Sequence, residues 1–129
     1  MKYISTRGHP DKQSFSQVLL SGLAEDGGLM LPETLPKVTD AELTAWRALP
    51  YHMLAHAVLS KFVDIDDIES ATLAALTKAT YTKDVFGTDE ITPLRSIDGY
   101  VQGMHIQALS NGPTLAFKDM AMQLLGRLF

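Results

Sequence analysis

Apolar residues in the first 80 positions recur at the spacing of short amphipathic helices, and turn-forming residues separate the runs. This pattern predicts four helices and two short strands. The expected helices are residues 14–22, 39–49, 51–62 and 66–79, and the expected strands are residues 3–5 and 29–31. The first part of the chain is therefore predicted to be mainly helical.

Local signals at the predicted helix ends support these boundaries. Ser14 can cap the first helix, and Thr39 followed by Glu42 is a capping-box signature for the second. Pro50 ends the second helix and suits the first turn of the third. The positive N-terminal end of the fourth helix is expected to attract the acidic side chains that begin it, namely Asp66, Asp67 and Glu69.

The pattern changes after Thr80. Residues 81–90 are typical of a connector, and β-rich runs on either side of Asp98 and Gly99 predict two strands joined by a two-residue hairpin turn. A loop over residues 110–114 follows. The last predicted helix then carries an apolar stripe made of Ala121, Leu124, Leu125 and Leu128.

These two parts define the predicted organisation, which is of the α/β class. Residues 1–80 are expected to form a mainly helical N-terminal domain, and residues 81–129 to begin a second domain. Its strand-loop-helix unit needs further strands to cover the sheet edge and the helix face. We therefore expect the unit to be incomplete and the chain to be the front of a longer protein.

The composition is that of a globular protein, because 46% of the 129 residues are hydrophobic and 20% are charged. The net charge of −4 leaves no basic surface for nucleic acid or an acidic membrane, and no apolar run reaches the roughly 18 residues of a membrane span. The chain has no cysteine, which fits a reducing compartment, and its N-terminus has no apolar signal segment. These features predict a cytoplasmic protein without nucleic-acid or membrane partners.

Lys118 stands in an unusual place for a lysine. It follows the apolar run of residues 115–117 and falls within the first turn of the last predicted helix. A positive helix end and partial burial both disfavour an ammonium group, so this amine is expected to lose its proton more readily than a surface lysine. An uncharged amine is what condensation with a carbonyl cofactor or substrate requires. On spacing alone, a lysine that reaches solvent beside a capping loop is the favoured alternative.

The loop before Lys118 has the features of an anion site. Gly112 lets the backbone approach a ligand, and Ser110, Asn111 and Thr114 offer neutral donors near a helix N-terminus. Asp119 is expected to cap the helix or to support the loop.

The segment SNGPTLAFKDMAMQLLGRLF, which contains this lysine, resembles the threonine synthase family, in which a G-P-T-x-A-F-K-D string carries the lysine that binds pyridoxal phosphate. The stretches STRG, SFSQVLLSGLAEDGGLMLPETLP and YHMLAHAVLSKFV resemble the N-terminal region of the same family. Order and spacing agree across nearly the whole chain. Many members carry His where Asn111 stands, so the chain departs from the family at that position.

The resemblance implies a fold-type II pyridoxal-phosphate enzyme (tryptophan synthase β-like) with a family-specific N-terminal domain. It implies a carbon–oxygen lyase of threonine biosynthesis, which converts O-phosphohomoserine and water to threonine and phosphate. Lys118 would hold the cofactor and move protons at Cα and Cβ of the substrate. Ser110, Asn111 and Thr114 would contact substrate or cofactor. The family's glycine-rich phosphate loop is expected beyond residue 129, so the piece alone is expected to be inactive.

Other functions and sites are weighed against this interpretation. The chain could be a non-catalytic binding or assembly module, or part of a related phospho-lyase with another phosphorylated amino acid as substrate. Self-association of the piece through its open sheet edge is also expected. No metal site is predicted, because His52 and His56 lack a third ligand and the acidic run 64–69 lacks the glycine of a calcium loop. Arg7 is either a phosphate contact or a structural residue.

Overall fold

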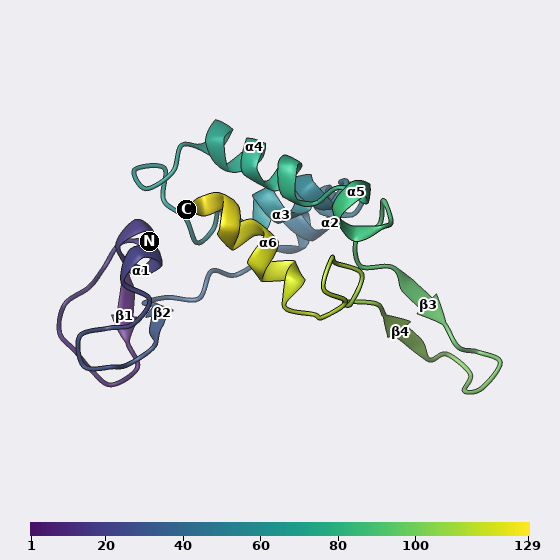
Figure 1. Ribbon diagram of the computed structural model, residues 1–129, viewed down its shortest axis with the longest axis horizontal. Helices are drawn as coiled ribbons and strands as arrows, with labels where there is room; N and C mark the ends of the chain where they lie inside the picture. The colour runs from purple at the N-terminus through teal and green to yellow at the C-terminus, as the bar shows by residue number, and fades with distance from the viewer. The chain divides into compact units, whose positions relative to one another are not determined.

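The computed structural model describes residues 1–129, and Figure 1 labels its helices and strands. The chain forms two compact units. Unit 1 comprises Met1–Ala48 and Ala55–Leu73, and unit 2 comprises Leu49–Leu54 and Ala74–Phe129. The elements in chain order are β1 (Tyr3–Ser5), α1 (Phe15–Ser21), β2 (Met30–Pro32), α2 (Asp40–Trp46), α3 (Tyr51–Leu59), α4 (Ser70–Thr80), α5 (Lys83–Phe86), β3 (Leu94–Ser96), β4 (His105–Gln107) and α6 (Asp119–Leu128). The chain is thus a mixed α/β structure. The predicted domain boundary at residue 80 stays a prediction.

The strands of unit 1 form a two-stranded antiparallel sheet. In β1 and β2, Tyr3 lies opposite Pro32 and Ser5 lies opposite Met30. The strand predicted at residues 29–31 is therefore confirmed with a shift of one residue. Tyr3 is buried, and its hydroxyl donates to the carbonyl of Phe62 at 2.9 Å. The sheet is in this way fixed to the chain that follows α3.

A carboxylate organises the turn between α1 and β2. Asp26 accepts hydrogen bonds from the Ser5 hydroxyl at 2.8 Å and from the backbone N–H groups of His9 and Gly28 at 3.0 and 2.8 Å. Gly28 can only be a glycine here, since a Cβ would lie 2.9 Å from Oδ1 of Asp26. Arg7 donates from Nη1 to the Asp26 carbonyl at 2.9 Å, which is a structural contact.

Helix α1 begins where the sequence predicts, but its N-terminus also binds a carboxylate that the sequence pattern placed elsewhere, that of Asp67. The capping box of Ser14 and Gln17 is present. In addition, Asp67 accepts hydrogen bonds from the backbone N–H groups of Phe15 and Ser16 at 3.2 and 3.1 Å. Partial burial raises the pKa of Asp67, but hydrogen bonds with these residues and Ser14 outweigh it and leave the pKa below its usual value. A distant carboxylate therefore neutralises the positive end of α1.

This contact corrects the prediction for the fourth helix. α4 begins at Ser70 rather than at residue 66, and it has no acidic residue in its first turn. Residues 65–67 form a turn instead, and the Asp67 carboxylate accepts a hydrogen bond from the N-terminus of α1. The acidic residue Asp67 does bind a helix N-terminus, but its partners in that helix are 51 and 52 residues away in sequence.

Helices α2 and α3 follow the predicted pattern with one change. The capping box of Thr39 and Glu42 begins α2 as expected. Glu42 also pairs with Lys61 at 2.5 Å, and these hydrogen bonds lower the pKa of Glu42 to about 2. α3 ends at Leu59 rather than at residue 62, because the next turn tightens to bonds between residues three apart, such as Phe62 N–H to the Leu59 carbonyl.

Residues 81–90 were expected to be a connector, and this expectation is wrong in part because they contain the short helix α5. Thr82 caps its start by accepting from the Val85 N–H at 3.3 Å. Gly87 ends it in the left-handed conformation with φ of 72°. Phe86 is only 1% exposed, so burial of one aromatic ring supports this single turn.

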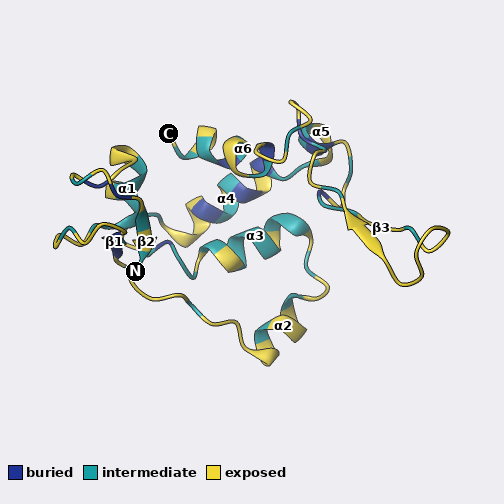
Figure 2. Ribbon diagram, turned by 90° about the horizontal axis from the view of Figure 1, so that it is seen from below, coloured by how far each residue is buried: buried dark blue, intermediate teal, exposed yellow.

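The hairpin of unit 2 differs from the predicted one in its turn. β3 and β4 pair antiparallel with Ser96 opposite His105, so residues 97–104 form the connection rather than Asp98 and Gly99 alone. The Asp98 carboxylate accepts from the Gly103 N–H at 2.7 Å and from the Ser96 hydroxyl, which stabilises the longer loop. All positions of both strands are exposed, as Figure 2 shows for β3.

An aromatic cluster anchors α6 within unit 2. The ring of Tyr81 packs against Tyr51 and Phe86, with ring centroids 5.0 and 5.9 Å apart. Its hydroxyl donates to the Met120 carbonyl in the first turn of α6 at 3.0 Å. Burial, together with the nearby Tyr51, raises the pKa of Tyr81 to about 12. The neutral phenol is therefore the form that holds α6.

Replacing Asp67 by Ala should lower the free energy of unfolding by about 1 kcal/mol, because two N–H groups of α1 lose their acceptor. Since the folded-state pKa is lowered, the contribution is present above about pH 4 and is lost as the pH falls further. Urea unfolding followed by circular dichroism between pH 2 and 7 measures both effects. Asp66→Ala is the matched control, and an equal loss in that variant would contradict the assignment.

Replacing Tyr81 by Phe should cost about 1 kcal/mol, because the ring packing remains but the bond to Met120 is lost. The raised pKa of Tyr81 means that its contribution is present below about pH 10 and is lost as the pH rises towards 12. Denaturant unfolding at pH 8 and pH 11 tests this. Tyr51→Phe is the control, since Tyr51 lies in the same cluster without bonding Met120. A smaller effect for Tyr81→Phe than for the control would exclude the anchor.

Candidate functional site

The loop between β4 and α6 presents Lys118 at the start of a helix. Lys118 occupies the N-cap position of α6 with helical φ and ψ of −61° and −25°, and its side chain makes no capping hydrogen bond. Two tight turns lead into it, because Leu115 N–H donates to the Gly112 carbonyl at 3.0 Å and Asp119 N–H to the Ala116 carbonyl at 3.1 Å. The lysine therefore lies where the loop becomes a helix, as the sequence predicts.

The carboxylate of Asp119 is the central group of this loop. It is 2% exposed, and Oδ2 accepts from the backbone N–H and the hydroxyl of Thr114 at 2.8 and 2.9 Å. Oδ1 accepts from Gln123 at 3.4 Å, one turn further along α6. Burial raises the pKa of Asp119, but the hydrogen bonds from Thr114 and Gln123 outweigh it, and the net pKa lies below its usual value. Asp119 is thus a buried anion that supports the loop.

Gly112 is required by its contact with this carboxylate. A Cβ at this position would lie 2.7 Å from Cγ of Asp119, which is too close for any side chain. The close approach continues in the next turn, where Leu115 adopts a left-handed conformation with φ of 57°. A leucine is strained in this region of backbone space, so the surrounding hydrogen bonds must hold it there.

Asn111 fixes the other end of the loop. Its Nδ2 donates to the carbonyls of Ile91 and Ala108 at 3.1 and 3.4 Å. Ile91 is 1% exposed and has φ of 61°, which is unusual for a β-branched residue. Asn111 therefore stabilises a second strained position. Sequence reasoning missed the role of Ile91, and it expected Gly112 to approach a ligand rather than the Asp119 side chain, because neither contact leaves a local signal.

The expected burial of Lys118 is wrong within this chain. Lys118 is exposed, and its amine makes no hydrogen bond or ion pair. The preceding apolar residues also face solvent, with Leu115 75% and Phe117 66% exposed. The inner side of the loop is taken by Gly112 and Asp119, which leaves the apolar side chains outside. The chain alone supplies an accessible amine rather than a buried one.

The three weaker candidates lie near Lys118 in sequence but differ in what they can offer. Thr114 is exposed, yet its hydroxyl and N–H both donate to Asp119. The Asn111 amide donates to two backbone carbonyls. Ser110 is exposed at the start of the loop. Their contact with a substrate or cofactor stays a prediction, and the structure gives Asn111 and Thr114 internal roles.

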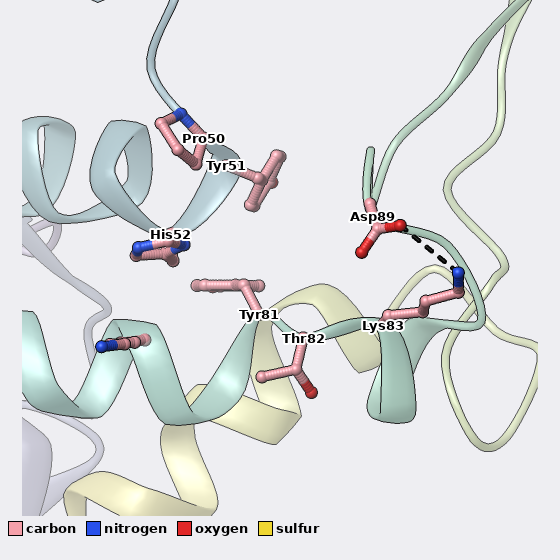
Figure 3. Close-up of a pocket in the computed structure, with 8 residues that line it drawn as sticks. Pro50, Tyr51, His52, Tyr81, Thr82, Lys83 and Asp89 are labelled. Carbon is pink, nitrogen blue, oxygen red and sulfur yellow. Dashed lines mark ion pairs between the residues drawn. The ribbon is translucent and has the colours of Figure 1, made fainter.

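A separate open pocket of about 370 Å³ lies in unit 2 (Figure 3). Its lining residues are Pro50, Tyr51, His52, Lys78, Tyr81, Thr82, Lys83 and Asp89. Lys83 points towards Asp89, with which it forms an ion pair at 3.4 Å, and away from His52 (Figure 3). Because these polar groups do not converge, the pocket lacks the arrangement of a ligand site.

The alternative sites from the sequence find no support in the geometry. No group of three or more His, Cys, Asp or Glu side chains is arranged so that it could hold a metal ion. His56 instead lies near the hydroxyls of Ser70 and Ser60 at 3.2 and 3.4 Å. None of the helices has the length and continuous apolar character that a membrane span requires.

The family model and the similar proteins that match this chain carry the same family name. The family model described as Threonine synthase N terminus matches residues 2–81. Threonine synthase from Methylobacillus glycogenes is 47% identical over 136 residues, which cover 100% of this chain and 28% of the relative.

Solved structures agree over the same length. The crystal structure of threonine synthase from yeast superposes with a TM-score of 0.91 at 40% identity, over 99% of this chain and 25% of that one. The X-ray structure of PLP-bound threonine synthase from Brucella melitensis gives a TM-score of 0.90 at 41% identity, over 99% of this chain and 26% of that one. The chain therefore spans about a quarter of the length of the relatives it matches.

Proposed function

This chain belongs to the threonine synthase family, and we propose on that basis that it forms the N-terminal part of a pyridoxal-phosphate-dependent carbon–oxygen lyase. The reaction is the conversion of O-phosphohomoserine and water to threonine and phosphate in threonine biosynthesis. The shared name of the relatives and the PLP-bound Brucella structure support this assignment. A cytoplasmic location fits such an enzyme and a chain without cysteine.

Lys118 is the residue that we assign to the cofactor. The observation that carries this assignment is an accessible amine, free of hydrogen bonds and ion pairs, on a loop fixed by its own side chains. A primary amine that must condense with an aldehyde has to be reachable and unpaired. By contrast, Lys83 also begins a helix, but its amine is paired with Asp89. Lys118 therefore fits a carbonyl cofactor in access and position. Lys2, Lys37 and Lys78 are exposed as well, and the resemblance of the GPTLAFKD segment is what distinguishes Lys118 from them.

Four residues of this chain have roles in the proposed reaction. The cofactor, when bound, supplies the electron sink for carbanion chemistry. The Lys118 amine is the group that accepts and returns protons at Cα and Cβ of the substrate. Ser110 offers an exposed hydroxyl beside the loop for a substrate anion. Asn111 and Thr114 act chiefly by holding the loop in shape.

The domain organisation follows from the same proposal. We assign residues 1–80 to a family-specific N-terminal domain and residues 81–129 to the start of a fold-type II catalytic domain. The end of the family match at residue 81 supports this division. Because the chain spans about a quarter of its relatives, it supplies one part of the site and should be inactive by itself. Its exposed hairpin strands favour self-association of the isolated piece.

In the full-length enzyme that contains this sequence, borohydride reduction in the presence of pyridoxal phosphate should attach the cofactor to Lys118. Peptide mapping by mass spectrometry identifies the modified lysine among the seven in this chain and those elsewhere. Lys118→Arg should abolish the label, and the matched variant Lys83→Arg should retain it. A label that stays on another lysine in the unaltered enzyme would refute the assignment.

The full-length enzyme should also release phosphate from O-phosphohomoserine faster than from phosphoserine or phosphothreonine. The substrate differs from phosphoserine by one methylene, for which discrimination of about 10- to 200-fold is typical. Comparison of kcat/KM for the three compounds measures this. A preference for phosphoserine or phosphothreonine would point to a related phospho-lyase instead.

A further inference from the structure

We propose that Asp119 is a positioning residue, whose buried carboxylate fixes the loop from Gly112 to Lys118 and so sets the place of the Lys118 amine. The inference rests on the proposed function of Lys118 and deepens it. It assigns to the neighbouring carboxylate a role that acts through the backbone rather than on the substrate.

The contacts of Asp119 connect the loop to the helix. Oδ2 accepts both donors of Thr114, four residues before Lys118, and Oδ1 accepts from Gln123 within α6. Gly112 packs directly against the same side chain. One carboxylate therefore holds the chain both before and after Lys118, which leaves little backbone freedom at the lysine itself.

The strain in the loop shows that such a constraint is needed. Leu115 has φ of 57° and its side chain is 75% exposed, so packing of that side chain does not maintain the conformation. The Leu115 N–H donates to the Gly112 carbonyl at 3.0 Å, and the adjacent Thr114 is held on both its donors by Asp119. Without these hydrogen bonds, Leu115 should relax to negative φ and shift the residues that follow it.

The carboxylate does not act on the Lys118 amine directly. The two residues are neighbours in sequence, but Asp119 is buried and Lys118 is exposed, and no ion pair joins them. Asp119 accepts hydrogen bonds from Thr114 and Gln123 instead. The amine is consequently left free, which distinguishes a positioning role from neutralisation of a charge.

The test uses the full-length enzyme with pyridoxal phosphate and measures how fast added cofactor becomes fixed to Lys118 by borohydride, per mole of folded protein. Asp119→Ala should slow this by about 10- to 100-fold, since displacement of a reacting group by about 1 Å has effects of that size. Asp119→Asn should recover most of the rate, because its carbonyl oxygen can accept the Thr114 bonds. Thr114→Val, which keeps the N–H donor, should lie between. In turnover, kcat should fall more than KM rises.

Asp26 provides a matched control in unit 1, because like Asp119 it accepts from a hydroxyl and from backbone N–H beside a glycine; its donors are Ser5 and the N–H groups of His9 and Gly28. Asp26→Ala should leave the rate of fixation per folded molecule unchanged. An equal loss in Asp26→Ala would overturn the proposal, since general destabilisation would then explain both. Equal losses in Asp119→Asn and Asp119→Ala would also overturn it.

The experiment distinguishes an error in the positioning role of Asp119 from an error in the cofactor role of Lys118. If the unaltered enzyme is labelled at Lys118 and Asp119→Ala is labelled at the same rate, only the positioning role is wrong. If the unaltered enzyme is not labelled at Lys118, the proposed function itself fails. Should Asp119→Ala not fold, Thr114→Val decides, because a normal rate in that variant excludes the role and a reduced rate with normal folding supports it.

Discussion

The buried carboxylate of Asp119 is the constraint on which the candidate site depends. A carboxylate removed from water needs donors, and the loop provides them from Thr114 while α6 provides Gln123. Meeting this requirement brings Gly112 into contact with the side chain and excludes every larger residue there. The same requirement that fixes the loop turns its apolar residues and Lys118 outward. Accessibility of the amine is therefore a consequence of the burial of its neighbour.

Carboxylates bound to backbone N–H groups recur throughout the chain. Asp26 holds a turn in unit 1, Asp67 holds the start of α1, and Asp98 holds the hairpin loop. The helices have 4 to 11 residues and the strands have three, so few of these elements would be stable in isolation. Carboxylate acceptors at the ends of these short elements bind backbone N–H groups and so add stabilising hydrogen bonds. No buried side-chain polar atom is left without a partner, which shows how fully these bonds are made.

Features with a local cause could be predicted from the sequence. The capping boxes at Ser14 and Thr39 begin helices as expected, because both partners lie within one turn. The position of Lys118 at a helix start was equally predictable. The fourth helix was placed too early because Asp67 has its partners 51 and 52 residues away. No local pattern reports such a contact.

Burial was the least predictable property for the same reason. An apolar run before Lys118 suggested a lysine packed among hydrophobic groups, yet Phe117 is 66% exposed. The sequence shows which residues are apolar, but which side of a loop faces inward depends on contacts such as that between Gly112 and Asp119. The short helix α5 was missed because a single turn has no periodicity, although Thr82 and Gly87 are ordinary cap residues.

The exposure of Lys118 separates two requirements that a reactive lysine must meet. The amine must be reachable in one place, and its ammonium form must be disfavoured by a positive helix end or by loss of water. This chain provides the place, because Lys118 stands at the N-cap of α6. It does not provide the loss of water, because Leu115 and Phe117 face solvent beside it. Under the proposed function, the exclusion of water falls to the three-quarters of the enzyme outside this chain and to the cofactor itself. A rigid loop is suited to that division, since a fixed amine can be covered by a separate part without losing its position.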